Sequence, residues 1–291
     1  MRRGLRQDLF MNESSLFCDN PAMLDECSQI IARHLLGSEL SIKIRLRYED
    51  LKANFDAVTF DEWEADGEYP LWKFSSGLTP YMDYDDTSIV PIPIVKELFK
   101  FDDRVVSFDF PVWFNMADTQ AFRVMILCQD PVSRDIRWYK DCRDALCTTV
   151  FGLHNPLWRN KGNGGKRIWL LASKFMENGY GVYLTDCNKF AIQSTSGEAI
   201  SPDPQQVAAY RDMLKAEIEM VKPNLIVTFG KLAEDVLQSL SQASAPVLSL
   251  PHFSGQAQGK IKEFFSWSDD KAFTIEEQAN CYFETITKAI H

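Results

Sequence analysis

The pattern of apolar and polar residues changes along the 291-residue chain. From about residue 104 onward, short apolar runs alternate with longer segments whose apolar residues recur at helical spacing. Such alternation predicts an α/β/α sandwich of three layers around a central, mainly parallel sheet. The predicted strands are residues 105–110, 122–128, 182–185, 225–229 and 247–250, and the predicted helices are residues 140–150, 168–178, 204–221, 231–240 and 275–290.

The first 104 residues show no single periodicity. Residues 23–36 predict a helix that begins after Asn20, and residues 41–48 alternate as in a strand or a short amphipathic segment. Residues 56–103 mix aromatic residues with acids and prolines, and a disordered segment would not contain so many aromatics. We therefore interpret residues 1–104 as an acidic, aromatic-rich extension packed on a main domain of residues 105–291.

Charge is distributed unevenly along the chain, whose net charge is −10. Residues 1–104 hold 12 Lys and Arg against 20 Asp and Glu, a net of −8, which leaves 19 (31 − 12) against 21 (41 − 20) in the remainder. Residues 134–189 hold ten basic and five acidic residues. That segment suits contact with phosphates, although a solvated helix face gives the same count. The acidic extension suits a protein partner.

The seven cysteines are scattered and include no C-x-x-C pair. Their odd number favours a reducing compartment, and their spacing gives no support for a zinc or iron–sulfur site. The sequence has no apolar stretch near the roughly 18 residues of a membrane span and no signal-peptide pattern at its start. We expect a cytoplasmic protein that uses neither a metal nor an organic cofactor and does not contact a membrane.

Polar loops follow four of the predicted strands. In an open α/β sheet, ligands bind outside the carboxyl ends of the strands, so these loops predict a site at one edge. The loops contain Gln129-Asp130-Pro131, Asp186-Cys187-Asn188-Lys189, Gly230-Lys231 and His252-Phe253-Ser254.

Over roughly residues 105–265, these segments together resemble the uracil-DNA glycosylase superfamily. Residues 221–233, V-K-P-N-L-I-V-T-F-G-K-L-A, are similar to its helix–strand–glycine segment. Gln129-Asp130-Pro131 is similar to its water-activating loop, residues 183–189 to its Y-x-T-N-x-x-K segment, and His252-Phe253-Ser254 to its His-Pro-Ser loop. The resemblance implies the superfamily fold and hydrolysis of a base–sugar bond in single- or double-stranded DNA.

The chain departs from the superfamily pattern at three positions. Asp186 stands where the superfamily has an asparagine that pairs with uracil, and Asn188 is the nearest substitute. A carboxylate does not offer the donor and acceptor pattern of an amide unless it is protonated. Val132 replaces a tyrosine that excludes the thymine methyl group, and Phe190 replaces the cysteine of members with an iron–sulfur cluster. The resemblance therefore leaves the identity of the base open.

Cleavage of an N-glycosidic bond requires a carboxylate near the sugar and a hydrogen-bond donor near the departing base. The resemblance assigns the first role to Asp130 and the second to His252, with Gln129, Asp186 and Asn188 binding the base. Phe151 is the candidate for stacking on an extruded base. Taken alone, Asp130 also suits a helix N-cap or turn, His252 an ordinary loop, and Phe151 an ordinary core.

Five residues are candidates for contact with the DNA backbone: Lys166, Arg167, Lys189, Ser254 and Gly255. The preceding Asn163-Gly164-Gly165 is also the pattern of a flexible surface turn. Three functions remain open: a divergent DNA-base N-glycosylase, a catalytically inactive binding protein with the same fold, and an α/β enzyme acting on a nucleotide or phosphorylated small molecule. The third lacks the usual glycine-rich phosphate-binding motifs.

Overall fold

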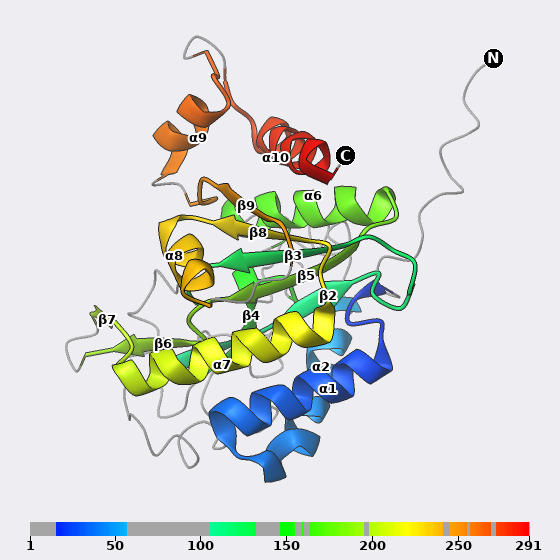
Figure 1. Cartoon of the computed structure of the whole chain (residues 1–291), viewed down its shortest axis with the longest axis vertical. Helices are drawn as coiled ribbons and strands as arrows, with labels where there is room; N and C mark the ends of the chain where they lie inside the picture. The colour runs from blue at the N-terminus through cyan, green and yellow to red at the C-terminus, as the bar shows by residue number, and fades with distance from the viewer. Residues whose placement is uncertain are drawn as a thin grey trace, which may run out of the picture.

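The computed structural model describes residues 16–56, 105–131, 146–154, 159, 163–194, 198–240, 245–254, 257–268 and 272–290. The predictions for residues 57–104, Val132 and Gly255 lie outside these ranges. The described strands form a five-stranded sheet in the order β2-β5-β3-β8-β9 and a four-stranded sheet in the order β4-β1-β6-β7 (Figure 1). The strands are β1 (Val105–Phe110), β2 (Val112–Phe114), β3 (Arg123–Cys128), β4 (Leu146–Thr149), β5 (Gly181–Asp186), β6 (Phe190–Gln193), β7 (Ala199–Ile200), β8 (Leu225–Phe229) and β9 (Val247–Leu250).

The five-stranded sheet is mainly parallel. Strands β5, β3, β8 and β9 run in one direction, and only β2 is antiparallel to its neighbour β5. Residues 124–128 of β3 are all buried, as expected for a parallel strand covered on both faces. Because the four parallel strands share a direction, their carboxyl ends meet at one edge of the sheet.

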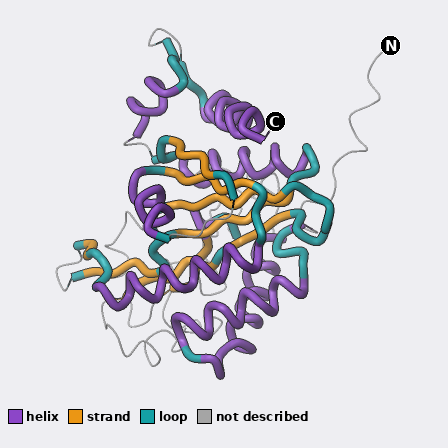
Figure 2. The backbone as a smooth tube through the Cα atoms, in the orientation of Figure 1, coloured by secondary structure: helices purple, strands orange, loops and turns teal. Residues whose placement is uncertain are grey.

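Helices cover both faces of this sheet (Figures 1 and 2). Helices α6 and α10 lie on one side, and α7 lies on the other with α1 and α2 beside it. This layered α/β arrangement confirms the predicted fold class. The helices are α1 (Pro21–Ile31), α2 (Ser41–Asp56), α6 (Asn163–Glu177), α7 (Pro204–Val221), α8 (Lys231–Ser239), α9 (Gln258–Phe264) and α10 (Ile275–Ile290), and a π-helical turn, Ala32–Leu36, continues α1. No helix in the described part of the chain has the length and apolar character needed to cross a membrane.

Two of the predicted helix starts are explained by capping. The Asn20 side chain accepts the N–H of Met23 at 3.1 Å at the start of α1. At the start of α7, the Asp203 side chain accepts two backbone N–H groups, and Gln206 accepts the N–H of Asp203 at 2.9 Å. Caps of this kind satisfy backbone donors that have no partner inside the helix.

The strand alternative for residues 41–48 was wrong, and so was the helix prediction for residues 146–149. Residues 41–48 form the first half of α2, because the alternation also fits helical spacing and Ile44 and Tyr48, four residues apart, are both buried. In the predicted helix 140–150, residues 146–149 form β4, which pairs in parallel with β1. Pairing with a neighbouring strand has overridden the local preference. Residues 140–145 lie outside the described ranges.

The N-terminal helices share one hydrophobic core with the sheet. Phe17 stacks on Phe55 of α2 with ring centroids 4.4 Å apart and contacts Phe114 of β2 edge-on at 5.6 Å. The ring centroids of Tyr48 in α2 and Trp113 in β2 are 5.4 Å apart. Aromatic contacts of this kind stabilise beyond the area that they bury, so α1 and α2 are integral to the described fold.

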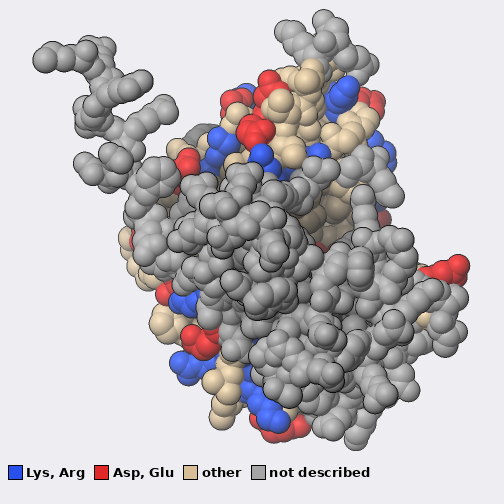
Figure 3. Space-filling model, turned by 180° about the vertical axis from the view of Figure 1, so that it is seen from behind, with Lys and Arg blue, Asp and Glu red and all other residues tan. Residues whose placement is uncertain are grey.

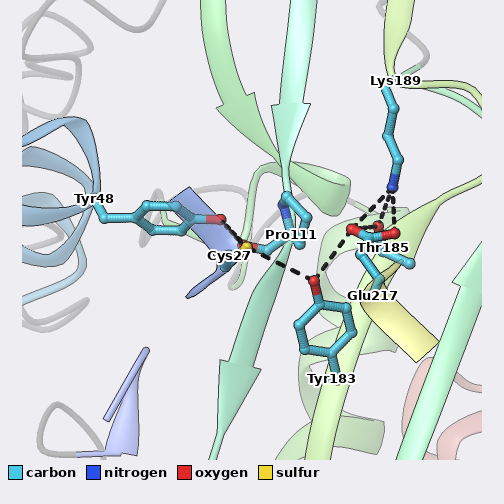
Figure 4. A network of polar contacts seen from close by, with 7 residues as sticks. All are labelled: Cys27, Tyr48, Pro111, Tyr183, Thr185, Lys189 and Glu217. Carbon is cyan, nitrogen blue, oxygen red and sulfur yellow. Dashed lines mark hydrogen bonds and ion pairs between the residues drawn. The ribbon is translucent and has the colours of Figure 1, made fainter. Parts of the chain in front are cut away.

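A buried ion pair lies at the centre of a polar network between β5 and α7 (Figure 4). The Nζ atom of Lys189 donates to both carboxylate oxygens of Glu217, at 2.9 and 3.1 Å, and to the hydroxyl of Thr185. The hydroxyls of Tyr183 and Thr185 donate to the same Oε1 of Glu217, at 3.1 and 3.0 Å. All four side chains are fully buried, so the two charges depend on each other and on these hydroxyls.

The network extends to the N-terminal helices through one thiol. The Sγ atom of Cys27 in α1 lies 3.8 Å from the Tyr183 hydroxyl and 3.2 Å from the Tyr48 hydroxyl (Figure 4). The Tyr48 hydroxyl donates to the carbonyl of Pro111 at 3.0 Å. Burial raises the pKa of the Cys27 thiol to about 12, so the thiol is neutral. Polar contacts therefore continue from α2 to the residues that follow β5.

We predict that Lys189→Met lowers the free energy of unfolding by about 3–5 kcal/mol, because it leaves the Glu217 carboxylate buried without a counter-charge. The matched control is Lys215→Met on the same α7, which removes an exposed pair with Asp212 and should cost at most about 1 kcal/mol. Urea denaturation of both variants measures the difference. Equal losses in the two variants would contradict the structural role of the buried pair.

Candidate functional site

The loops after β3 and β5 lie side by side at the carboxyl edge of the sheet. Cys128 and Asp186 are paired in register at the strand ends. Beyond them, the N–H of Cys187 donates to the carbonyl of Cys128 and the N–H of Asn188 donates to the carbonyl of Gln129, each at 3.0 Å. The pairing thus continues past the strands and fixes the two loops against each other.

Gly230 brings a third and a fourth loop into the same place. It follows β8 with a φ of +92°, and its N–H donates at 3.0 Å to the carbonyl of Leu250, the last residue of β9. A Cβ atom on this residue would lie 3.2 Å from Cδ of Gln129 and 3.3 Å from Cβ of His252. A glycine is required because its backbone is in the left-handed region and the loops close around it.

The His252 loop is held by contacts from two helices. The hydroxyl of Tyr282 in α10 donates to the carbonyl of Pro251 at 2.9 Å, and Nη1 of Arg167 in α6 donates to the carbonyl of Phe253 at 2.7 Å. Phe253 is fully buried, with its ring 4.3 Å from that of Phe229. These contacts fix the backbone on both sides of the imidazole.

The orientation of the imidazole determines which nitrogen is a donor. The N–H of Ser254 donates to Nδ1 of His252 at 3.1 Å. Since Nδ1 accepts this hydrogen bond, the neutral ring carries its proton on Nε2. His252 therefore presents an Nε2–H donor from the loop after β9.

Phe151 lies beside this imidazole. The two ring centroids are 6.0 Å apart and the rings are tilted by 33°. Phe151 has a φ of +54°, and its ring packs so closely on Gly164 of α6 that a Cβ there would lie 3.1 Å from Cδ1. A large side chain in this backbone region is strained, and such strain concentrates at functional sites. The stacking role of Phe151 remains a prediction, and its ring lies next to the His252 imidazole.

Three carboxyl groups influence one another at this edge. Asp130 is exposed, and partial desolvation of its carboxyl raises its pKa above the usual range. Asp186 and Asp109 are almost completely buried, and burial raises the pKa of Asp186 to about 7 and that of Asp109 well above its usual range. The neighbouring Asp186 carboxyl raises the pKa of Asp109 further, and the charge of Asp130 raises the pKa of both buried groups.

The structure contradicts two predicted contacts with the DNA backbone. Lys189 is fully buried and paired with Glu217, because three acceptors surround its ammonium group inside the fold. Arg167 is only 5% exposed, and its guanidinium holds the His252 loop. Lys166 stays at the surface, where it pairs with Glu276 at 2.8 Å, and Ser254 lies next to His252.

Residues 163–165, for which the sequence left open a phosphate contact or a flexible surface turn, form the first turn of α6, where Gly164 contacts Phe151. Figure 3, which shows the molecule from behind, has described basic and acidic side chains next to one another. Not all ten basic residues within 134–189 are available to phosphates, since Lys189 and Arg167 are buried and bind groups inside the fold.

Sequence reasoning missed Asp109, an acid within an otherwise apolar strand, V-V-S-F-D-F. Acids are rarely buried without a partner, so its position in that run was a usable signal. It also missed Tyr282, whose hydroxyl anchors the His252 loop. Within the described ranges, no three His, Cys, Asp or Glu side chains are arranged to hold a metal ion.

The fold and this edge define an α/β protein whose polar loops gather at the carboxyl ends of parallel strands. The family model described as the uracil DNA glycosylase superfamily matches residues 116–275, more than half of the 291-residue chain. The chain belongs to the uracil DNA glycosylase superfamily. A comparison with curated proteins finds no match.

We predict that Gly230→Ala displaces His252, because the new methyl group would contact the Gln129 and His252 side chains. The control is Gly179→Ala, at a glycine that also has a positive φ, +78°, but has nothing within 4 Å of the added Cβ. With four histidines in the chain, ¹H–¹³C spectra resolve the imidazole signals one by one. The His252 signal should move only in Gly230→Ala, and an unmoved signal would disprove the close approach.

We also predict that the carboxyl pair makes the folded state less stable as pH rises. Between pH of about 4 and 7, the folded protein keeps protons on Asp109 and Asp186 that the unfolded chain releases, so the free energy of unfolding falls through this window. The double variant Asp109→Asn/Asp186→Asn lacks this titration and should show a smaller fall. Urea denaturation at several pH values measures how the free energy of unfolding depends on pH, and the control is Asp118→Asn, which changes an exposed carboxylate. If the free energy of unfolding of the double variant and of the parent falls equally with pH, the raised pKa values are refuted.

Proposed function

We propose that this protein is a DNA-base N-glycosylase, in which Asp130 and His252 act on opposite sides of a base–sugar bond. The observation that carries the proposal is the convergence of these two loops around Gly230, at the edge where α/β sheets bind ligands. Membership of the superfamily supports a glycosylase-like function in general.

The proposed role of Asp130 is to position a water molecule and to stabilise the cationic sugar. Bond cleavage passes through a state that resembles an oxocarbenium ion, which a nearby carboxylate stabilises electrostatically. Asp130 is exposed at the end of β3, where a substrate has access, and its raised pKa makes the carboxylate a better base toward water. Both features suit a residue that accepts a proton from water.

The proposed role of His252 is to donate a hydrogen bond to the departing base. Negative charge develops on the base as the bond breaks, and a donor held in place stabilises it. The Nε2–H of the neutral ring is such a donor, and the Arg167 and Tyr282 contacts hold the loop that carries it. Phe151 beside the imidazole would stack on a base extruded from the duplex.

Gln129 and Asn188 are proposed as base-binding residues, since both lie partly exposed on the paired loops after β3 and β5. DNA is the proposed partner, with Lys166, Ser254 and Gly255 as the remaining candidates for backbone contact. We further propose a cytoplasmic location and a role in removing altered bases.

The test is release of a free base from single- and double-stranded oligonucleotides that contain uracil, hypoxanthine, xanthine or a modified pyrimidine. Asp130→Asn and His252→Ala should each lower the rate by roughly 10²–10⁴-fold, as expected for loss of a proton acceptor or a charge-stabilising donor. The control Asp118→Asn removes an exposed carboxylate from the loop before β3 and should leave the rate unchanged.

Two results would count against the proposal. Unchanged base release in Asp130→Asn would remove this residue from the mechanism. Absence of release from every substrate while DNA is still bound would instead favour a binding protein that kept the fold.

A further inference from the structure

The turn that carries Phe151 is closed by hydrogen bonds between its two ends. The N–H of Leu153 donates to the carbonyl of Val150 at 3.3 Å. The N–H of His154 donates at 3.1 Å to Oγ1 of Thr149, which also lies 3.0 Å from Nδ1 of the His154 ring. Thr149 and His154 are fully buried, so the ends of the turn are anchored inside the fold.

Arg159 binds the end of this turn and, through the same guanidinium, the N-terminal region. Its Nη1 atom donates to the carbonyl of Leu153 at 2.8 Å and, less closely, to that of His154 at 3.4 Å. Its Nη2 atom donates at 3.1 Å to the carbonyl of Phe55, near the end of α2. A guanidinium presents its N–H groups as a rigid planar fork, so one side chain joins two backbone segments that are far apart in the sequence.

Aromatic rings compensate for the burial of this cation. Arg159 is 8% exposed. The central carbon of its guanidinium lies 3.8 Å from the ring centroid of Phe55 and 5.2 Å from that of Trp169 in α6. The two rings also meet edge-on, with centroids 5.6 Å apart. Cation–π contacts stabilise a desolvated guanidinium, which is less strongly hydrated than an ammonium group. Arg159 therefore ties the turn to helices α2 and α6 at once.

The strained residue of the turn is Phe151, whose φ is +54°. A side chain keeps such a conformation only where its surroundings impose it. Gly164 at the start of α6 lies against the ring, and Arg159 binds the carbonyls that follow in the chain. Held in this way, the Phe151 ring centroid lies 6.0 Å from that of the His252 imidazole. The placement of this ring thus depends on contacts that Arg159 makes.

We propose that Arg159 is a positioning residue of the site: it holds the end of the turn, keeps the Phe151 ring beside His252, and makes α2 a support of the site. Its consequence for catalysis rests on the glycosylase function proposed above, in which Phe151 stacks on an extruded base. The effect of Arg159 on base release then passes through Phe151, because a displaced ring no longer holds the base at the correct place.

The first test observes the imidazole directly in ¹H–¹³C spectra. Phe151→Leu removes the ring current beside His252 and should shift the imidazole signal. Arg159→Lys keeps the charge without the planar fork, and Arg159→Met removes both, so each should shift the His252 signal in the same direction as Phe151→Leu. The control is Arg123→Lys, because Nη1 of Arg123 donates at 2.9 Å to the carbonyl of Val221 at the opposite end of β3. This control should leave the signal in place.

The second test measures base release by the same variants. Arg159→Lys and Phe151→Leu should each lower kcat/KM by roughly tenfold to a hundredfold, as expected when a contact with the substrate moves by about 1 Å. The two losses should not add in the double variant, since both act on the same ring. Arg123→Lys should leave kcat/KM unchanged. Urea denaturation confirms that each variant is folded, and Arg159→Lys decides the outcome if Arg159→Met does not fold.

Three results would overturn the inference and leave the glycosylase function standing. They are a His252 signal that stays in place in Phe151→Leu or in Arg159→Lys, an equal shift in Arg123→Lys, and additive losses of base release in the double variant. If no base is released from any substrate, the glycosylase function fails instead. The His252 signal then decides alone whether Arg159 holds the ring, because that measurement needs no activity.

Discussion

The buried ion pair between Lys189 and Glu217 is the interaction on which the candidate site depends. A lysine without exposed surface is costly unless its charge and all of its donors are satisfied. Glu217 and Thr185 satisfy them, and this requires α7 to pack with Glu217 under the end of β5. The lysine in turn holds the loop after β5, whose carbonyl at Lys189 accepts the N–H of Asp109. Through one charge pair, α7 fixes the loop after β5 and its contact with β1.

The remaining loops are fixed by backbone contacts. Parallel register places the ends of β3, β5, β8 and β9 at one edge, but register alone leaves the loops free to diverge. Gly230 prevents this, since its missing side chain lets Gln129 and His252 approach. The contacts of Arg167 and Tyr282 with the His252 loop come from helices on the far side of the sheet from α7. Helices on both faces of the sheet therefore constrain the site, which is the condition for a donor and a carboxylate to keep a fixed separation.

Much of the fold was predictable because its elements have strong local signals. Strand β8 and helices α7 and α10 have the predicted bounds, since a continuous apolar strand and an amphipathic helix of four or more turns are hard to mistake. The second sheet was not predicted, because pairing of β1 with β4 and β6 joins segments that are far apart in sequence. For the same reason, Lys189 and Arg167 were taken for surface cations. Nothing within a few residues of them reveals that Glu217 or the carbonyl of Phe253 is their partner.

The site itself was predictable as a set of loops, and its chemistry was not. The order of the loops after β3, β5, β8 and β9 indicates one edge, and the structure brings Gln129, Gly230 and His252 together there. Asp109 lies beside the loop after β5 only because the second sheet packs beside the first, so that its N–H donates to the carbonyl of Lys189. Burial raises the pKa of both acids, and the charge of Lys189 lowers both pKa values although its three donors are engaged by Thr185 and Glu217. The protonation of these acids thus depends on a contact between the two sheets and on a lysine that α7 holds in place, and neither is visible in the local sequence.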